Sequence, residues 1–195
     1  MKICFASNNP HKLGEIRDAL MGRPINLLSL HDINCFEELP ETKQTLEGNA
    51  LEKAEHVLNN YGIVCFADDT GLEVDALQGA PGVYSARYAG VGKKSDDNID
   101  LLLSNMSNKS NRNAQFRTVI ALVGLEQHPV FFEGIVKGQI TRERRGSGGF
   151  GYDAVFVPMG NSKTFAEMTL PEKNSLSHRA FAVRKLHDYL TSRAD

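Results

Sequence analysis

The sequence has few cysteines and no excess of positive charge, and both absences exclude classes of protein. Only 3 of the 195 residues are cysteine, namely Cys4, Cys35 and Cys65, and their spacing matches no zinc-binding pattern. Cys4 and Cys65 stand inside apolar runs, which predicts buried thiols. Lysine and arginine total 22 against 24 acidic residues, and the formal net charge of -2 argues against a nucleic acid or a membrane surface as partner. A small anionic ligand needs only a local cluster of cations.

Long apolar runs, repeats and low-complexity segments are also missing. No apolar stretch reaches the length needed to cross a bilayer, and the N-terminal residues lack the apolar core of a secretory signal peptide. We therefore expect a cytoplasmic protein. With 41% hydrophobic and 24% charged residues, the chain suits a single globular domain over residues 1–195, with room for two lobes.

Hydrophobic periodicity predicts an α/β fold on a mixed sheet. Strands are expected at 2–6, 25–30, 63–67, 116–125, 130–141 and 152–157, and helices at 11–21, 45–59, 95–106 and 177–192. The two longest strands are separated by a short turn, which is typical of an antiparallel hairpin. Residues 71–92 are rich in glycine and are expected to be mostly loop, with Leu72–Val74 as a candidate short strand.

The segment from Ser7 to Lys12 predicts an anion site where the first strand leads into the first helix. Asn8 or Asn9 can cap the helix and Pro10 suits its first turn, so that backbone N–H groups and the positive helix end face the ligand. Lys12 adds a positive charge. The alternative is a well-capped helix with a solvated lysine. A Walker loop is excluded because the G-x-x-x-x-G-K spacing is absent.

Asp68 and Asp69 predict a metal site and a general base at the end of a buried strand. Ligands gather beyond the carboxyl ends of strands in α/β sheets, and two acids placed there repel each other unless a cation relieves them. Mg²⁺ does so, and it binds through one or two carboxylates together with substrate phosphates. Glu41 is a candidate second ligand, and Asn49 and Lys53 share one helix face. An Asp-rich turn and ordinary surface polar residues are the alternatives.

Two aromatic residues among glycines, Phe150 and Tyr152, predict a pocket for a purine base. Glycine lets the backbone approach a ligand closely, and stacking on an aromatic face is worth about 1–3 kcal/mol per base. His178 and Arg179 follow Ser177, the expected N-cap of the last helix, where an arginine is poorly placed for the helix dipole. A ligand oxygen or phosphate would offset that cost. Core aromatics in a hairpin and a surface arginine are the alternatives.

Taken in order, these segments resemble the inosine/xanthosine triphosphate pyrophosphatase family. The matching stretches cover almost the whole chain, at 6–12 with Glu15, around Glu41, at Asn49 and Lys53, and at 67–72, 79–88, 148–153 and 172–179. Each motif is weak alone, whereas the ordered set is specific. One departure lies in the first loop, where the family often has Thr-Gly-Asn and this chain has Ser7, Asn8 and Asn9. Asparagine tolerates left-handed backbone, so the turn is expected to survive.

The resemblance implies a two-lobed α/β fold on a long mixed sheet flanked by helices, with the nucleotide in a cleft between the lobes. It implies a Mg²⁺-dependent homodimer that hydrolyses ITP, dITP and XTP to the monophosphate and pyrophosphate. Glu41 and Asp69 would hold the metal, and Asp69 and Lys12 would be catalytic. The other implied residues bind substrate: the triphosphate at Ser7, Asn8, Asn9, Pro10, His11 and Lys12, phosphate or ribose at Lys53, Thr70 and Lys173, and the base at Phe150, Gly151, Tyr152, Asp153, His178 and Arg179.

Two rival hypotheses are left open. One is a related pyrophosphatase that acts on another modified nucleotide, such as a pyrimidine. The other is a nucleotide-sensing protein without turnover. The carboxylates favour an enzyme, because binding a triphosphate alone gains little from acids beside its phosphates.

Overall fold

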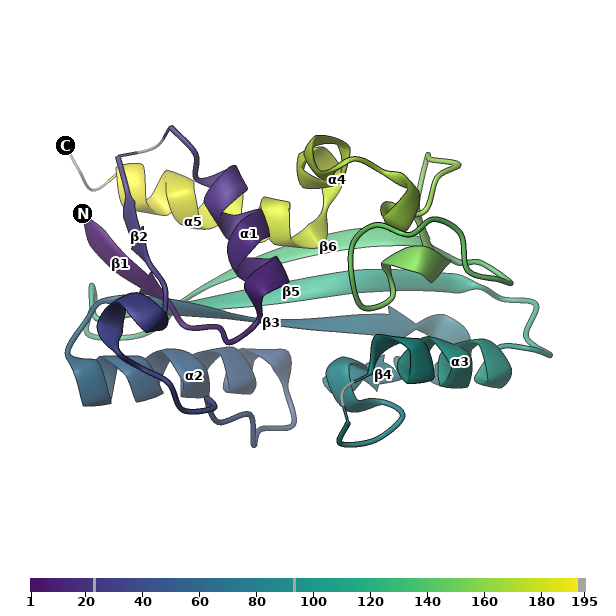
Figure 1. Cartoon of the computed structure of the whole chain (residues 1–195), viewed down its shortest axis with the longest axis horizontal. Coiled ribbons are helices and arrows are strands. Elements are labelled where there is room, and N and C mark those ends of the chain that lie inside the picture. Colours follow the sequence, from purple (N-terminus) through teal and green to yellow (C-terminus); the bar gives the residue numbers. More distant parts are fainter. Residues whose placement is uncertain (23, 93, 193–195) are drawn as a thin grey trace. The chain divides into compact units, whose positions relative to one another are not determined.

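The computed structural model describes residues 1–22, 24–92 and 94–192, which contain both α-helices and β-strands (Figure 1). The strands are β1 (Lys2–Phe5), β2 (Asn26–Leu28), β3 (Cys65–Val74), β4 (Pro81–Gly82), β5 (Asn113–Val123), β6 (Val130–Ile140) and β7 (Phe156–Pro158). The α-helices are α1 (Pro10–Ala19), α2 (Leu46–Tyr61), α3 (Ser95–Asn105), α4 (Leu170–Leu176) and α5 (His178–Thr191). Among the described residues, no helix has the length and apolar character to span a membrane.

The strands form one mixed sheet, which confirms the predicted α/β class. Neighbouring strands follow the order β2-β1-β3-β5-β6-β7, and β4 pairs with β3. The strand β1 runs parallel to both β2 and β3, whereas the β3–β4 and β6–β7 pairs are antiparallel. By its contacts the chain divides into two compact units.

The first unit comprises Met1–Asp69, Thr118–Gly134 and the described residues from Arg179 onward. Because side chains alternate along a strand, it has an apolar layer on each face of its sheet. Phe5 and Phe66 pack with α1 and α5, and their rings stack at 5.1 Å. The opposite layer lies against α2 and includes the three buried thiols, Cys4, Cys35 and Cys65. Figure 1 shows α1 and α5 on one side of β1 and β3, and α2 on the other.

The second unit comprises Thr70–Arg117 and Ile135–His178, and aromatic rings form part of its interior. Phe116 packs edge-on against Phe156, with ring centroids 4.7 Å apart. Phe156 stacks on Phe165 at 5.4 Å, and the His178 ring stacks on Phe116 at 4.6 Å. All four side chains are buried. The unit thus holds an aromatic cluster that includes His178, the first residue of α5.

Two predicted strand boundaries are wrong. β3 does not end at Asp68 but continues to Val74, because the polar residues that follow Ala67 keep extended backbone and pair onward with β4. The strand predicted over 152–157 forms only in its last part. Asp153–Val155 form a 3-10 helix instead, and β7 begins at Phe156. The first of these differences determines the geometry of the candidate site.

Candidate active site

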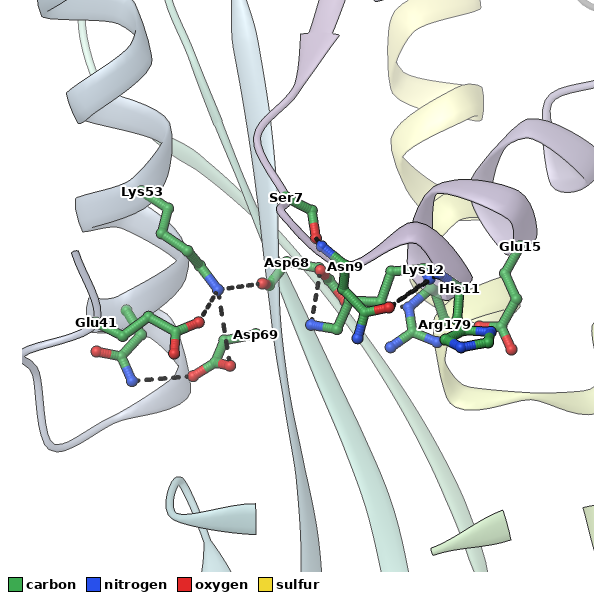
Figure 2. Close-up of polar contacts among 11 residues, drawn as sticks. Ser7, Asn9, His11, Lys12, Glu15, Glu41, Lys53, Asp68, Asp69 and Arg179 are labelled. Carbon is green, nitrogen blue, oxygen red and sulfur yellow. Dashed lines mark hydrogen bonds and ion pairs between the residues drawn. The ribbon is translucent and has the colours of Figure 1, made fainter. Parts of the chain in front are cut away.

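Asp68 and Asp69 lie in the middle of β3, and alternation sends their side chains to opposite faces of the sheet. Asp68 shares the face of Phe66, toward α1 and α5, and Asp69 shares the face of Ala67, toward α2. Figure 2 shows Asp69 beside Glu41 and Lys53 on one side of the strand, and Asp68 with Lys12 and Arg179 on the other. The argument that the two carboxylates crowd one another at a strand end therefore fails.

Asp68 is a fully buried anion held between two cations. Lys12 Nζ donates to Asp68 Oδ1 at 3.0 Å, and Arg179 Nε donates to Oδ2 at 3.1 Å. Burial alone would raise the pKa of Asp68, but Lys12, Arg179 and Lys53 outweigh it and hold that pKa well below its ordinary value. Burial also lowers the pKa of Lys12, against the opposing effect of Asp68. Asp68 is thus a fixed counter-ion that places the ammonium group of Lys12.

Arg179 is buried and contacts two carboxylates. Besides its bond to Asp68, it donates from Nη1 to Glu15 Oε2 of α1. Burial would lower the pKa of Arg179, but Asp68 and Glu15 outweigh it and raise that pKa. These acids supply the anions that the first turn of α5 needs, so no ligand is required to explain an arginine there. Contact between Arg179 and a base stays a prediction.

The opposite face of β3 carries a second charged cluster. Lys53 Nζ donates to Glu41 Oε1 at 2.8 Å and to the main-chain oxygen of Asp68 at 2.8 Å, and lies 3.9 Å from Asp69 Oδ1. Asn49 Nδ2 donates to Asp69 Oδ2 at 3.1 Å. The prediction that Asn49 and Lys53 share one face of α2 is confirmed, and their burial excludes the alternative of ordinary surface residues. Both side chains are buried.

The electrostatics of this cluster suit a base and a metal ligand. Burial raises the pKa of Asp69, and Lys53, Lys12 and the Asn49 bond oppose that rise only in part. Burial would lower the pKa of Lys53, but the surrounding carboxylates outweigh it and raise that pKa. Among the described residues, no group of three or more His, Cys, Asp or Glu gathers as a complete metal cage. Glu41 and Asp69 therefore offer two carboxylates around a position that already attracts a cation.

The first loop confirms the predicted helix cap and shows that its amides are engaged. Asn9 Oδ1 accepts from His11 N at 2.9 Å and from Lys12 N at 3.3 Å, and Pro10 occupies the first turn of α1. Ser7 Oγ accepts from Asn9 N at 3.2 Å. A phosphate that bound the first-turn amides would thus have to displace the Asn9 carboxamide.

In the second unit, Asp153 organises the predicted base pocket. Its Oδ2 accepts from Phe150 N at 2.9 Å and from Lys173 Nζ at 2.6 Å. Lys173 Nζ also lies 4.8 Å from the centre of the Phe150 ring. A side chain at Gly149, which has a φ of +70°, would collide with the Asp153 carboxylate. Phe150, Asp153 and Lys173 thus form one cluster.

Two other predicted base-pocket residues, Tyr152 and His178, are buried inside this unit, and Gly151 and Thr70 are half-buried. Tyr152 is buried, and its hydroxyl donates to the main-chain oxygen of Ser85 at 2.8 Å. His178 stacks on Phe116, and Gly151 adopts a left-handed φ of 59°. Thr70 is half-buried and follows Asp69 along β3. The core alternative noted from the sequence therefore describes the packing of Tyr152.

Comparison with known proteins extends these findings over the whole chain. The sequence matches the model of the Ham1 family over residues 3–189. A dITP/XTP pyrophosphatase of Flavobacterium johnsoniae is 55% identical over 192 residues, which cover 98% of this chain and 99% of the relative. A dITP/XTP pyrophosphatase of Porphyromonas gingivalis is 55% identical over 190 residues, 97% of each chain. A HAM1 protein structure from Coxiella burnetii matches with a TM-score of 0.90 at 36% identity, covering 98% of this chain and 99% of that one.

Proposed function

Because the chain belongs to the Ham1 family, we propose that it hydrolyses the non-standard purine nucleoside triphosphates ITP, dITP and XTP to the monophosphate and pyrophosphate. The relatives in F. johnsoniae and P. gingivalis bear the name dITP/XTP pyrophosphatase, in agreement with the resemblance carried by the motifs. The chain is then a hydrolase of a phosphoric anhydride. Its cellular effect is to cleanse the nucleotide pool of bases that would otherwise enter nucleic acid.

One observation carries the proposal, namely the placing of lysines and carboxylates on the two faces of β3. Lys12 and Lys53 supply positive charge, and Glu41 and Asp69 supply oxygen ligands and a base. Phosphoryl transfer requires neutralisation of the charge that develops on phosphate oxygens, and fixed cations provide it. A protein that only bound triphosphates would gain nothing from Asp69 and Glu41.

Mg²⁺ is the cofactor we propose, with Glu41 and Asp69 as its protein ligands. The fit rests on the donor set: both ligands are carboxylates, and Mg²⁺ commonly takes one or two of these and completes its shell with water and substrate phosphates. Lys53 lies near both acids and offsets one of their two negative charges, which leaves one for the ion. When bound, the ion neutralises negative charge on the phosphate oxygens.

Asp69 is the base that takes a proton from the attacking water. The raised pKa of its buried carboxyl makes it a stronger proton acceptor than an exposed aspartate, and Asn49 orients one of its oxygens. Lys12, held by Asp68, stabilises the triphosphate as pyrophosphate leaves. The rest of the phosphate loop, Ser7 to His11, holds the triphosphate at the start of α1.

The remaining predicted residues contact the purine base and the sugar. Phe150 stacks on the purine, with Asp153 and Lys173 holding the turn beside it. Lys53, Thr70 and Lys173 contact phosphate or ribose. The other proposed base contacts are Gly151, Tyr152, His178 and Arg179.

The proposal also includes an assembly and a location. We treat residues 1–195 as a single pyrophosphatase domain that acts in the cytoplasm as a homodimer, with a small nucleotide as its partner and neither nucleic acid nor membrane. Sedimentation of the purified protein tests the dimer directly. A monomer at enzymatic concentrations would remove that part of the proposal without affecting the chemistry.

A panel of triphosphates with product analysis tests the function. ITP, dITP, XTP, GTP, ATP and modified pyrimidine triphosphates are incubated with the protein and Mg²⁺, and the monophosphate and pyrophosphate are separated by chromatography. The Asp69→Asn variant is the matched control for a contaminating phosphatase. Faster turnover of a modified pyrimidine would favour the first rival, and binding of ITP without any product would favour the nucleotide sensor.

A further inference from the structure

Glu41, the proposed metal ligand, belongs to a stretch of chain that has no regular structure of its own. Residues 34–45 form neither helix nor strand, so the position of Glu41 depends on side-chain bonds at each end. On the C-terminal side, Thr42 donates to Glu52 of α2 through both N and Oγ1, at 2.8 and 2.6 Å. Lys43 N donates to Asn49 Oδ1 at 2.8 Å. These bonds attach one end of the stretch to α2.

The N-terminal side is attached in two directions. The Glu37 carboxylate accepts from Tyr61 Oη at 2.9 Å and lies 3.1 Å from His56 Nε2, which ties it to α2 as well. The backbone around it is tied to the phosphate loop: Asn8 Nδ2 donates to Glu37 O at 3.2 Å, and Leu39 N donates to Asn8 Oδ1 at 3.3 Å. The Asn8 carboxamide thus bonds to the main-chain oxygen of Glu37 and to the main-chain N–H of Leu39, two residues further on.

We propose that Asn8 is a positioning residue, which fixes the backbone ahead of Glu41 against the phosphate loop and so sets the place of this metal ligand relative to the triphosphate. The inference rests on the proposed function for its chemistry, and it assigns Asn8 a task other than phosphate contact. A carboxamide suits this task because it is donor and acceptor at once, whereas an aspartate could only accept.

The backbone of Asn8 offers no competing reason for an asparagine. Among the described non-glycine residues, only Asn34 and Gln78 have a positive φ, so Asn8 does not use the left-handed conformation that the sequence suggested. Alanine can therefore replace it without backbone strain. The cap of α1 comes from Asn9 and stays intact in such a variant.

Loss of both Asn8 side-chain bonds should weaken binding of the divalent ion. A typical hydrogen bond contributes a factor of about 2 to 10, so Asn8→Ala should raise the metal concentration for half-maximal activity about 5- to 10-fold. Asn161→Ala is the matched control, since Asn161 is exposed and the one side-chain bond it makes within the described part of the chain is to the nearby Met159 oxygen, at 3.4 Å.

Two readouts do not depend on turnover. Mn²⁺ binding in the presence of inorganic pyrophosphate, followed by electron paramagnetic resonance, should weaken by the same factor in Asn8→Ala and not in Asn161→Ala. Hydrogen exchange should show the Leu39 amide protected in the wild type and faster in Asn8→Ala. An unprotected Leu39 amide in the wild type, or equal Mn²⁺ affinity in the two variants, overturns the proposal even if Asn8→Ala proves unstable. Absence of triphosphate hydrolysis by the wild type would contradict the proposed function but not the role of Asn8, because Mn²⁺ binding and hydrogen exchange would still report on that residue.

Discussion

Asp68 and Asp69 are adjacent in the chain, yet their carboxylates face opposite sides of β3 and different cations. Asp68 is fully buried between Lys12 and Arg179, whereas Asp69 lies near Lys53 and accepts from Asn49 (Figure 2). Consecutive residues of a strand point to opposite faces, so this division follows directly from extended backbone at this point. It separates an acid held between two buried cations from the acid proposed as the base.

The two acids should respond differently to the same substitution. Asp69→Asn should leave the free energy of unfolding within about 1 kcal/mol of wild type and lower kcat for ITP by about 10²–10⁴-fold, the contribution of a general base. Asp68→Asn should cost about 3–5 kcal/mol of stability, because it leaves buried cations without their anion. Urea unfolding and steady-state turnover measure both. Similar activity losses at similar stabilities would contradict the division.

Lys12→Ala should weaken binding of the triphosphate far more than binding of the nucleoside. The ammonium group of Lys12 is the charge that Asp68 holds at the start of α1, and a nucleoside has no phosphate for it to contact. Calorimetry with ITP and with inosine, in a metal that does not support turnover, separates the two. Equal losses for both ligands would show that Lys12 acts on the fold and not on phosphate.

Arg179 should affect selectivity, and the test must keep the protein folded. Because Arg179 bonds to both Asp68 and Glu15, Arg179→Ala should destabilise the protein strongly, and Arg179→Lys is the variant that keeps the charge. The wild type should prefer ITP and XTP to GTP, and GTP should equal or exceed ATP. Loss of a donor to the 6-oxo group should then lower the ITP-to-ATP ratio of kcat/KM in Arg179→Lys. A constant ratio would confine Arg179 to its structural ion pairs.

Gly149→Ala should damage the proposed base pocket through Asp153. The φ of +70° strains any side chain, and the new methyl group would meet the carboxylate that accepts from Phe150 N and Lys173 Nζ. We expect KM for ITP to rise about tenfold or more, as for a loss of well-placed hydrogen bonds. Gly160→Ala, which also has positive φ but meets no atom within 4 Å and is not a proposed substrate contact, is the control. Equal KM values for the two variants would count against the cluster.

Local patterns in the sequence predicted α1, α2, α3, α5 and the cap in the first loop, but the short helix α4 was missed. The structure places Thr45 and Gly62 as the caps of α2, and Asn9 and Pro10 begin α1 as predicted. The continuation of β3 was missed because Asp68, Asp69 and Thr70 are residues typical of turns, whereas backbone pairing with a later segment keeps them extended. The unbroken apolar run of Cys65, Phe66 and Ala67 was the available signal, because it indicates a strand with both faces buried.

Partners that are distant in the sequence were beyond prediction from local pattern. Arg179 meets Asp68 across 111 positions, and Asn8 meets Leu39 across 31. Nothing in the composition near either residue indicates which partner it will find, because tertiary packing decides it. The arginine was noticed only as an oddity at a helix start, and the asparagine only as a departure from a family motif.

The apolar layer against α2 contains three thiols whose reactivity reports whether this layer is packed against the sheet. Cys4, Cys35 and Cys65 are all reduced and are exposed by 0%, 2% and 0%. A water-soluble alkylating reagent can modify them only after this layer separates from the sheet. The rate at which mass spectrometry detects modified thiols would therefore report the rate of that separation. The measurement needs no dye, tag or engineered residue.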